Sequence, residues 1–285
     1  MTPFARLVTQ EKPTSVERLK MGRTGALLAT YPNGFKAVIK PVKAALPNGK
    51  TSQRGIPVPT HPYREVAYYE MAKLMKLDRL VPETVLTDKV VGVPSSAQQF
   101  MPAYHLRQLQ PKLADTDRDD WAALLTETAL RVPREQWRQL LALDIVAGVR
   151  DRHANNIGIL MDIRDERVSY RVVAWDNAVS FGKTFDRYHN VFHKYLFRKT
   201  VNFDDQWPTW DNLTLAQLEA ALSPYLSLTE IAHAFRRMEF FQQYPYRLPW
   251  RVVSQGNDSP KEFPSYQAFF APLTKTPQDL VALQP

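Results

Sequence analysis

A pair of apolar runs constrains the fold of this chain most strongly. Residues 157–175, IGILMDIRDERVSYRVVAW, contain two such runs on either side of a charged turn at residues 163–167. Apolar runs of this length that are separated by a short turn predict an antiparallel hairpin. Because antiparallel pairing places the start of one strand beside the end of the other, the flanking residues Asn156 and Asp176 should lie side by side.

Three oxygen-bearing side chains should meet at the open end of this hairpin. The segment DRHANN, residues 151–156, directly precedes the outgoing strand and places Asp151 on a loop beside Asn156 and Asp176. Carboxylate and amide oxygens suit Mg²⁺, which takes one or two carboxylates and completes its shell with phosphate and water. The hairpin therefore predicts a metal and phosphate site.

A second hairpin offers a cation for the phosphates. The apolar runs 26–30 and 35–41 are separated by Tyr-Pro-Asn-Gly, in which Asn33 and Gly34 both tolerate positive φ and signal a tight turn. Lys40 ends the second run, where a strand would hold its side chain rigidly. We expect Lys40 to bind phosphate.

A lysine that stays charged in a cleft needs an anionic partner. Apolar residues at helical spacing predict a helix that starts near Tyr63 and stops by Pro82. Glu65 and Glu70 both lie on this helix, and Glu65 is favoured as the partner of the lysine because it is nearer the helix start. The two hairpins and this helix together predict an ATP site between two lobes.

The rest of the chain divides into a β-rich part and a helical part. Residues 44–62 are rich in Pro, Gly, Ser and Thr and predict an exposed loop. Further strands are expected at 84–88 and 97–101, and helices at 121–132, 134–149, 215–225 and 229–244. The composition changes after Pro102, which predicts an α+β fold with lobes 1–102 and 103–285.

A strand lysine, a helix glutamate, an Asp-x-x-x-x-Asn loop and a later metal aspartate resemble the layout of protein-kinase-like enzymes. The Asp-Arg-His-x-x-Asn loop resembles in particular the phosphatidylinositol 3-/4-kinase branch of that superfamily. The segments REVAYYEMAKLM, LVPETV and VVAWDNAVSFG resemble small bacterial members of the branch, whose metal motif reads Asp-Asn-x-x-x-Phe. The resemblance extends over residues 20–200 and implies the two-lobe kinase-like fold.

The resemblance also implies a role for the polar residues of the site. Lys40 would bind the ATP phosphates with Glu65 as its partner, and Asp151 would be the catalytic aspartate. His153 would contact the transferred phosphoryl group, although a capping or packing role is an equal alternative. Arg150 departs from the family, in which a small residue often precedes Asp-Arg-His.

The same resemblance implies the metal ligands and the nucleotide contacts. Asn156 and Asp176 would hold Mg²⁺. The turn MGRTG would cover the phosphates through Gly22, Arg23, Thr24 and Gly25, although it lacks the three-glycine pattern of protein kinases. Adenine would lie between the lobes, near the hinge residues Phe100, Met101 and Ala103.

The expected activity is an ATP- and Mg²⁺-dependent transfer of the γ-phosphate to a hydroxyl. A protein Ser/Thr acceptor is placed slightly ahead of a phosphoinositide-type lipid head group, and a small metabolite remains open. Transfer of AMP is an alternative, because the same site can hold ATP in another orientation. A non-catalytic module that binds nucleotide or RNA is the alternative from another class.

Composition limits the class of protein and its partners. The chain has 285 residues and no cysteine, which excludes disulfide scaffolds and thiolate chemistry. No run approaches the roughly 18 apolar residues of a membrane span, and the N-terminus lacks the apolar core of a signal peptide. We expect a cytoplasmic protein without a transmembrane anchor, and export as an effector is left open.

The formal charge of +8 favours an anionic partner. Basic and aromatic residues alternate in RYHNVFHKYLFRK, a pattern that could bind RNA by stacking and charge. As the partner of this segment, an acidic acceptor is favoured over nucleic acid. In a kinase this segment falls where the substrate is recognised, so the residues expected to contact the acceptor are Lys183, Arg187, Lys194, Arg198 and Lys199. An amphipathic helix with a solvated basic face is an equal alternative. A zinc site at His189 and His193 is disfavoured, because no third ligand is evident.

The segment ALPNGKT, residues 45–51, ends like a nucleotide-binding P-loop but is rejected as one. The first position of the motif is Ala44 instead of glycine, and the following SQRGIPVP cannot start the helix that a P-loop requires. We expect a plain connection between the lysine strand and the glutamate helix.

Overall fold

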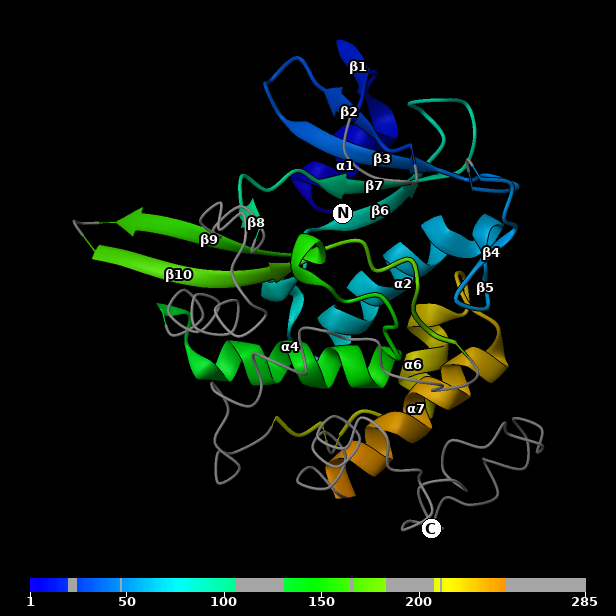
Figure 1. Cartoon of the computed structure of the whole chain (residues 1–285), viewed down its shortest axis with the longest axis vertical. Helices are drawn as coiled ribbons and strands as arrows, with labels where there is room; N and C mark the ends of the chain where they lie inside the picture. The colour runs from blue at the N-terminus through cyan, green and yellow to red at the C-terminus, as the bar shows by residue number, and fades with distance from the viewer. Residues whose placement is uncertain are drawn as a thin grey trace, which may run out of the picture.

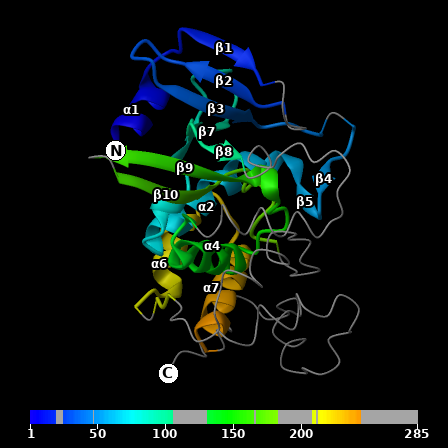
Figure 2. The same cartoon turned by 60° about the vertical axis from the view of Figure 1, so that its left-hand side comes forward.

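The computed structural model describes residues 1–19, 25–46, 48–105, 131–164, 167–182, 208–210 and 212–243. A five-stranded sheet lies at one end of the molecule, three helices lie at the other, and a smaller sheet lies between them (Figures 1 and 2). Helix α2 (His61–Leu74) contacts both the large sheet and the helices at the far end. This arrangement confirms the expected α+β class.

The large sheet is antiparallel, with strand order β1-β2-β3-β7-β6. Its strands are β1 (Ser15–Arg18), β2 (Leu27–Thr30), β3 (Lys36–Pro41), β6 (Thr84–Thr87) and β7 (Ser95–Gln99). The hairpin expected at 26–30 and 35–41 is confirmed as β2 and β3. Only Gly34 of the turn has a positive φ, +79°, while the side chain of Asn33 accepts a hydrogen bond from the backbone N–H of Phe35. The glycine alone therefore takes the left-handed position.

Two N-terminal elements were not expected from the sequence. Helix α1 (Pro3–Gln10) begins after Thr2, whose hydroxyl accepts a hydrogen bond from the backbone N–H of Ala5. Its buried residues Phe4, Leu7 and Val8 join the core of the large sheet. Strand β1 is exposed along its whole length, so it carries no apolar alternation by which the sequence could reveal it.

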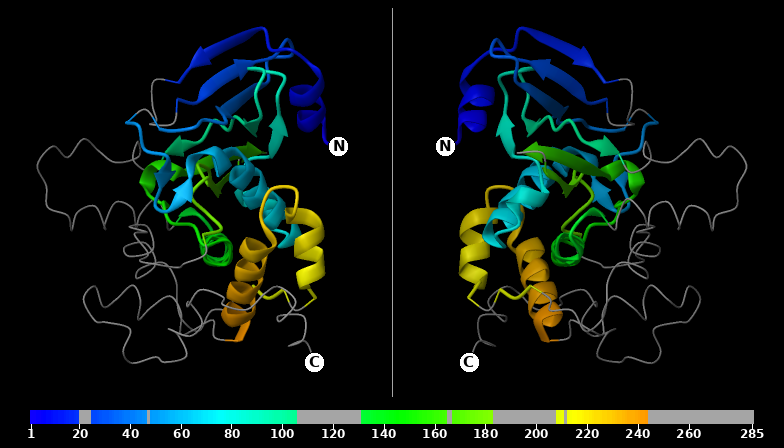
Figure 3. Two further views of the ribbon diagram at one scale, coloured as in Figure 1. Left: turned by 90° about the vertical axis from the view of Figure 1, so that its right-hand side faces the viewer. Right: turned by 90° about the vertical axis from the view of Figure 1, so that its left-hand side faces the viewer.

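Helix α2 starts at His61, two residues earlier than expected, and ends at Leu74, well before Pro82. Pro62 lies within the first turn, where the missing N–H of a proline costs no helical hydrogen bond. Glu65 is consequently in the second turn of the helix rather than the first. The helix is buried on most sides because it lies between the large sheet and the helices at the far end (Figure 3).

Residues 44–62 are not a plain exposed loop. They contain a short hairpin of β4 (Ser52–Gln53) and β5 (Ile56–Pro57), followed by a 3-10 turn, η1 (Val58–Thr60). Ile56 and Val58 are buried. Removing their apolar side chains from water is favourable, and this holds even a short segment in one position. No helix follows until α2, which agrees with the rejection of a P-loop.

The smaller sheet has the order β10-β9-β8 and contains the second expected hairpin. Its strands are β8 (Tyr104–His105), β9 (Ile157–Arg164) and β10 (Arg167–Ala174). Pairing runs from Arg167 opposite Arg164 to Ala174 opposite Ile157, which confirms the hairpin. The chain passes from the large sheet to the small one between β7 and β8, across the expected hinge.

The helices at the far end enclose the larger of two cores. They are α4 (Arg134–Ala147), α6 (Leu215–Leu222) and α7 (Leu228–Gln243), which confirms three of the expected helices. Helix α4 ends at Gly148, whose φ of +63° forms a left-handed cap. Most of the helix expected at 121–132 falls outside the described residues. Buried residues of α2, α4, α6, α7, β9 and β10 form one cluster around Trp137 and Phe181.

Two further short helical turns complete the described elements, η2 (Asp78–Leu80) and η3 (Ala154–Asn156). Turn η3 lies directly before β9, within the expected catalytic loop. No helix among the described residues is long and apolar enough to cross a membrane.

Candidate active site

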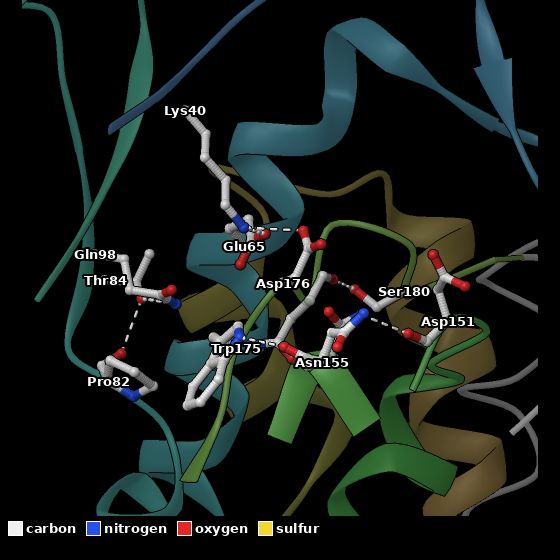
Figure 4. A network of polar contacts seen from close by, with 12 residues as sticks. Lys40, Glu65, Pro82, Thr84, Gln98, Asp151, Asn155, Trp175, Asp176 and Ser180 are labelled. Carbon is white, nitrogen blue, oxygen red and sulfur yellow. Dashed lines mark hydrogen bonds and ion pairs between the residues drawn. The ribbon is translucent and has the colours of Figure 1, made fainter. Parts of the chain in front are cut away.

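Three charged residues from three elements meet in one cluster (Figure 4). Lys40 on β3 places its Nζ 2.5 Å from Oε1 of Glu65 on α2 and 3.0 Å from Oδ1 of Asp176, which follows β10. The Lys40 side chain is 13% exposed and that of Glu65 is 1% exposed. A lysine thus lies between two carboxylates at the junction of the two sheets.

The alternative glutamate of α2 has a different partner. Oε2 of Glu70 is 2.8 Å from Nζ of Lys73, three residues along the same helix and 48% exposed at its side chain. The two glutamates are five residues apart, which places them on different faces of a helix with 3.6 residues per turn. Of the two, Glu65 is the one that contacts Lys40.

The cluster fixes the charge of its members. Burial alone would lower the pKa of Lys40, but the carboxylates of Asp176 and Glu65 outweigh burial and raise it above its ordinary value. Burial would raise the pKa of Asp176, but Lys40 lowers it, with smaller effects of the same sign from His153 and Arg152. Lys40 is therefore protonated and Asp176 ionised at neutral pH.

Asp176 has a left-handed backbone, with φ of +56°. Aspartate tolerates this region better than most residues, but the conformation still costs free energy, and such strain gathers at functional sites. The left-handed residue comes at the end of β10, where the chain leaves the hairpin. The turn allows the carboxylate to reach Lys40.

Asn156 ends η3 at the start of β9 and is buried, with 3% exposure. Its Nδ2 donates a hydrogen bond of 2.7 Å to the backbone oxygen of Asp151. Because Nδ2 is directed to the loop, Oδ1 is the atom that can bind a cation. The backbone N–H of Trp175 also donates to the backbone oxygen of Asn156, 3.1 Å away, which extends the β9–β10 pairing to the residue before Asp176.

The donor set at this end of the hairpin fits Mg²⁺ bound together with phosphate. It offers one carboxylate, Asp176, and one amide oxygen, Asn156, both hard ligands. Within the described ranges no group of three or more His, Cys, Asp or Glu side chains could hold a metal ion. With one carboxylate and one amide oxygen from the protein, a cation here would complete its shell with phosphate and water, as Mg²⁺ does on nucleotides.

The side chain of Asp151 is held by the β4–β5 hairpin instead of by the lysine cluster. Nε and Nη2 of Arg54 donate to its Oδ1 at 3.1 and 2.8 Å, and Nε2 of Gln53 donates to its Oδ2 at 3.0 Å. Both carboxylate oxygens therefore have protein donors. Neither Gln53 nor Arg54 was identified from the sequence. The Arg-Gly pair between Gln53 and Ile56 is the one local signal of a tight hairpin there.

Arg152, the second residue of the DRH motif, is completely buried. Its Nη2 and Nε donate to the two carboxylate oxygens of Asp144 on α4 at 2.8 and 3.0 Å. Nη2 also lies 3.2 Å from the hydroxyl of Tyr68 on α2, which in turn donates to Asp144 at 2.7 Å. This ion pair and the tyrosine link the loop of residues 151–156 to helices α2 and α4.

The same guanidinium joins the two halves of the site. Nη1 of Arg152 donates to the backbone oxygens of Asn156 and Trp175 at 3.1 and 2.9 Å, and Nη2 donates to Oδ1 of Asn177 at 2.6 Å. These acceptors flank both proposed metal ligands. Sequence reasoning missed this role, because Asp144 and Tyr68 carry no pattern that relates them to the loop.

Burial and the surrounding charges act on the ionisation of this network. Burial would lower the pKa of Arg152, but the carboxylate of Asp144 outweighs it, and the pKa is raised. Burial raises the pKa of Tyr68 well above its ordinary value, and Asp144 adds to the effect. Arg152 is thus charged and Tyr68 neutral at physiological pH.

His153 is half-buried in the loop of residues 151–156 and caps η3. Its Nδ1 accepts a hydrogen bond of 3.3 Å from the backbone N–H of Asn155. The capping role that sequence reasoning left open is therefore present. His153 is also one of the smaller influences that lower the pKa of Asp176, after Lys40, which places the ring near the cluster of Lys40, Glu65 and Asp176.

The expected hinge residues connect the two sheets. The backbone N–H of Phe100 donates to the backbone oxygen of Lys36 at 3.0 Å, and that of Ala103 donates to the oxygen of Met101 at 2.8 Å. Ala103 also lies close to Gly158 on β9. A Cβ at Gly158 would lie 2.9 Å from Cβ of Ala103 and 2.2 Å from Cη2 of Trp175.

Most of the expected phosphate-covering turn lies outside the described residues, including Gly22, Arg23 and Thr24. Gly25 has φ of +63°, and a Cβ there would lie 2.5 Å from Nζ of Lys43. A positive φ favours glycine at this position. The basic residues expected between 183 and 199 and the two histidines at 189 and 193 also fall outside the described part of the chain.

No family model and no curated protein matches the sequence. Solved structures do match the fold. The Golgi casein kinase with Mn and ADP bound has a TM-score of 0.50 and 13% sequence identity, over 87% of this chain and 76% of that one. Hydra Fam20 with sugar has a TM-score of 0.51 and 13% identity, over 87% of this chain and 86% of that one.

These two structures are similar to the chain in fold and remote from it in sequence. In both cases the similarity extends over 87% of this chain. The chain therefore has the two-lobe, protein-kinase-like fold that its sequence pattern predicted.

Proposed function

We propose that this protein is an ATP- and Mg²⁺-dependent phosphotransferase of the phosphatidylinositol 3-/4-kinase-like type, with lobes 1–102 and 103–285. One observation carries the proposal. Lys40 on β3, Glu65 on α2 and Asp176 in the segment after β10 form one charged cluster on a kinase-like fold. Buried charges are costly to maintain unless they are paired, and a cluster of this kind is suited to triphosphate.

In this proposal the nucleotide lies at the junction of the two sheets, with adenine near Phe100, Met101 and Ala103. Lys40 binds the phosphates, and Glu65 holds its ammonium group in place. Asn156 and Asp176 hold the metal, which supplies positive charge to the β- and γ-phosphates when it is bound. Asp176 contacts Lys40, and phosphate oxygens would take over part of that contact when nucleotide is bound.

Asp151 orients the acceptor hydroxyl in the transfer step. The acceptor oxygen forms a bond to the γ-phosphorus, the bond from that phosphorus to the bridging oxygen of ADP breaks, and the hydroxyl proton passes to Asp151 and then to solvent. Positioning and charge neutralisation carry most of the catalysis of such a step. Arg152 supports it indirectly, because it bonds the backbone beside both metal ligands.

A protein hydroxyl is the favoured acceptor, and a phosphoinositide-type head group is the second choice. The name of the similar Golgi casein kinase includes a protein substrate, and its structure contains ADP and Mn. The formal charge of +8 adds a preference for an acceptor with acidic groups near the hydroxyl.

The experiment that tests the function uses labelled nucleotide. The protein is incubated with Mg²⁺ and either γ-labelled or α-labelled ATP, alone, with a cell lysate and with phosphoinositide vesicles. Transfer of γ-label that is lost in Asp176→Ala supports the proposal, and the fraction that carries the label identifies the acceptor class. Transfer of α-label alone would mean AMP transfer instead. Binding of intact ATP without any transfer would contradict an enzymatic role.

A further inference from the structure

The tip of the β4–β5 hairpin combines an unusual backbone with an active-site contact. Ser52 pairs with Pro57 and Gln53 with Ile56, so Arg54 and Gly55 form the two-residue turn. Both have positive φ, +50° and +78°, as a type I′ turn requires. Asn, Asp or Gly usually occupies the first of these positions, because other side chains are strained there. An arginine at this position therefore needs another reason.

The contacts of the arginine supply that reason. Arg54 directs two N–H groups at Oδ1 of Asp151, and the amide of Gln53 donates to Oδ2. The side chain of Asp151 is 16% exposed beside these donors. Nη1 of Arg150 donates to the backbone oxygen of Arg54 at 2.8 Å and fixes the tip on the catalytic loop. Three donors thus converge on one carboxylate, and a fourth bond holds the hairpin that carries them.

These donors compete with an acceptor for the same atoms. In the proposed reaction, a hydroxyl must donate its proton to one of the Asp151 oxygens. Arg54 takes both lone-pair sites of Oδ1 and Gln53 takes one of the two on Oδ2, so a hydroxyl has at most one site left and competes with these donors for the carboxylate. Water is as small as a hydroxyl group but brings no other contacts that could compensate for the lost bonds. A larger acceptor can replace them with contacts of its own.

We propose that Gln53 and Arg54 are acceptor-selecting residues, which occupy Asp151 until an acceptor displaces them and thereby exclude water from the γ-phosphate. This inference rests on the proposed phosphotransferase function. The excluded reaction is the attack of water on the γ-phosphorus, in which ATP and water give ADP, inorganic phosphate and a proton. Displaced from Asp151, Arg54 retains two N–H donors suited to a carboxylate or phosphate group of the acceptor.

The contact can be tested without any activity, because trypsin cleaves after arginine only when the side chain can enter its pocket. Cleavage of the full chain between Arg54 and Gly55 is followed by mass spectrometry in wild type and in Asp151→Asn. Loss of the charged partner is expected to speed this cleavage about tenfold, as for loss of a charge-assisted hydrogen bond. Cleavage after Lys50, an exposed residue in the same connection, is the internal control.

A second variant keeps the catalytic residue. Arg54→Lys remains a trypsin site but can make one bond where the guanidinium makes two, so its cleavage should also be faster than in wild type. Thermal unfolding of each protein is measured in parallel with its digestion. A variant that unfolds globally would also be cleaved faster after Lys50. Equal cleavage rates at residue 54 in wild type and both variants would overturn the contact and the proposal with it.

Selection against water is tested by the rate of ATP hydrolysis without acceptor. Arg54→Ala should hydrolyse ATP about tenfold faster than wild type, and a further Asp151→Asn change should remove the gain. Lys50→Ala is the matched control and should behave as wild type. If wild type transfers phosphate and Arg54→Ala hydrolyses no faster, the selection proposal is wrong and the proposed function stands. If neither wild type nor any variant turns over bound ATP, the proposed function fails. The proposed selection against water then fails with it, whatever the digestion shows about the contact between Arg54 and Asp151.

Discussion

Nζ of Lys40 lies 3.0 Å from Oδ1 of Asp176, although 136 positions separate the two residues in the chain. Lys40 belongs to the large sheet, and Asp176 follows the last strand of the small one. The pair can form only when both sheets are in place, so it reports on the relative position of the two lobes. Glu65 makes the pair a cluster of three and draws helix α2 into the same geometry.

Lys40→Met should lower kcat by about 10²–10³-fold, the effect of removing one positioned group that stabilises transition-state charge. The change also leaves Glu65 buried without its cation. The measurement is steady-state transfer of γ-phosphate with saturating ATP.

Lys73→Met is the matched control for this prediction. Lys73 lies on α2 and has a carboxylate partner, Glu70, but its side chain is 48% exposed. Exposed ion pairs contribute little to stability, and activity should remain as in wild type. Equal losses in the two variants would contradict the role of Lys40.

Arg152→Met should destabilise the fold by about 3–5 kcal/mol, because it leaves the carboxylate of Asp144 buried without the guanidinium that balances its charge. Asp144→Asn in the same chain removes that charge and should recover part of the loss. The free energy of unfolding is measured in urea for the two single variants and the double variant.

The double-mutant cycle separates the pair from its surroundings. Strict additivity of the two single effects would contradict the assignment of Asp144 as the electrostatic partner of Arg152. Arg152→Lys keeps the charge but cannot reach all the acceptors around it. The activation free energy of phosphate transfer should therefore rise by more than the free energy of unfolding falls.

Several parts of the site could be predicted from the sequence because local pattern determines them. Apolar runs around Asn33-Gly34 and around residues 163–167 indicated two hairpins. Each hairpin fixes its register through the alternation of its residues, and register alone places Asn156 beside the end of β10. Lys40 and Asp176 were identified in the same way, as residues at the ends of strands.

The remainder depends on tertiary contacts that leave no local pattern. Arg54 and Asp151 meet because two loops far apart in sequence lie together, and neither loop contains a signal for the other. Arg152 was interpretable as part of the DRH motif, but its burial depends on Asp144 and Tyr68 on two different helices. The strand β1 was missed because no side of it is buried.

Stability should fall between pH 7 and pH 5 in part because of His61. Burial lowers the pKa of this histidine below its ordinary value, with smaller effects of the same sign from Arg64 and Lys40 and an opposite effect from Asp176. Between the folded pKa and the unfolded value of about 6.5, the unfolded chain binds more protons, so acid favours unfolding. The stabilising contribution is present above about pH 6.5 and is lost as the pH falls towards the folded pKa.

His61→Gln tests this contribution through the pH dependence of thermal unfolding. Nε2 of His61 is buried without a hydrogen-bond partner among the described residues, so a proton added there would gain none from the protein. The variant should lose less stability than wild type between pH 7 and pH 5. Identical slopes for the two proteins would rule out His61 as a contributor.

Gly158→Ala should destabilise the protein by about 1–3 kcal/mol, the usual cost of overpacking a filled space. A Cβ at this position would lie 2.2 Å from Cη2 of Trp175, so the indole ring would have to move. Trp175→Phe removes the atoms that clash, and the double variant should therefore lose less stability than the two single effects combined. Urea unfolding of all four proteins measures the coupling. Additive effects would show that the indole ring does not fill the space beside Gly158.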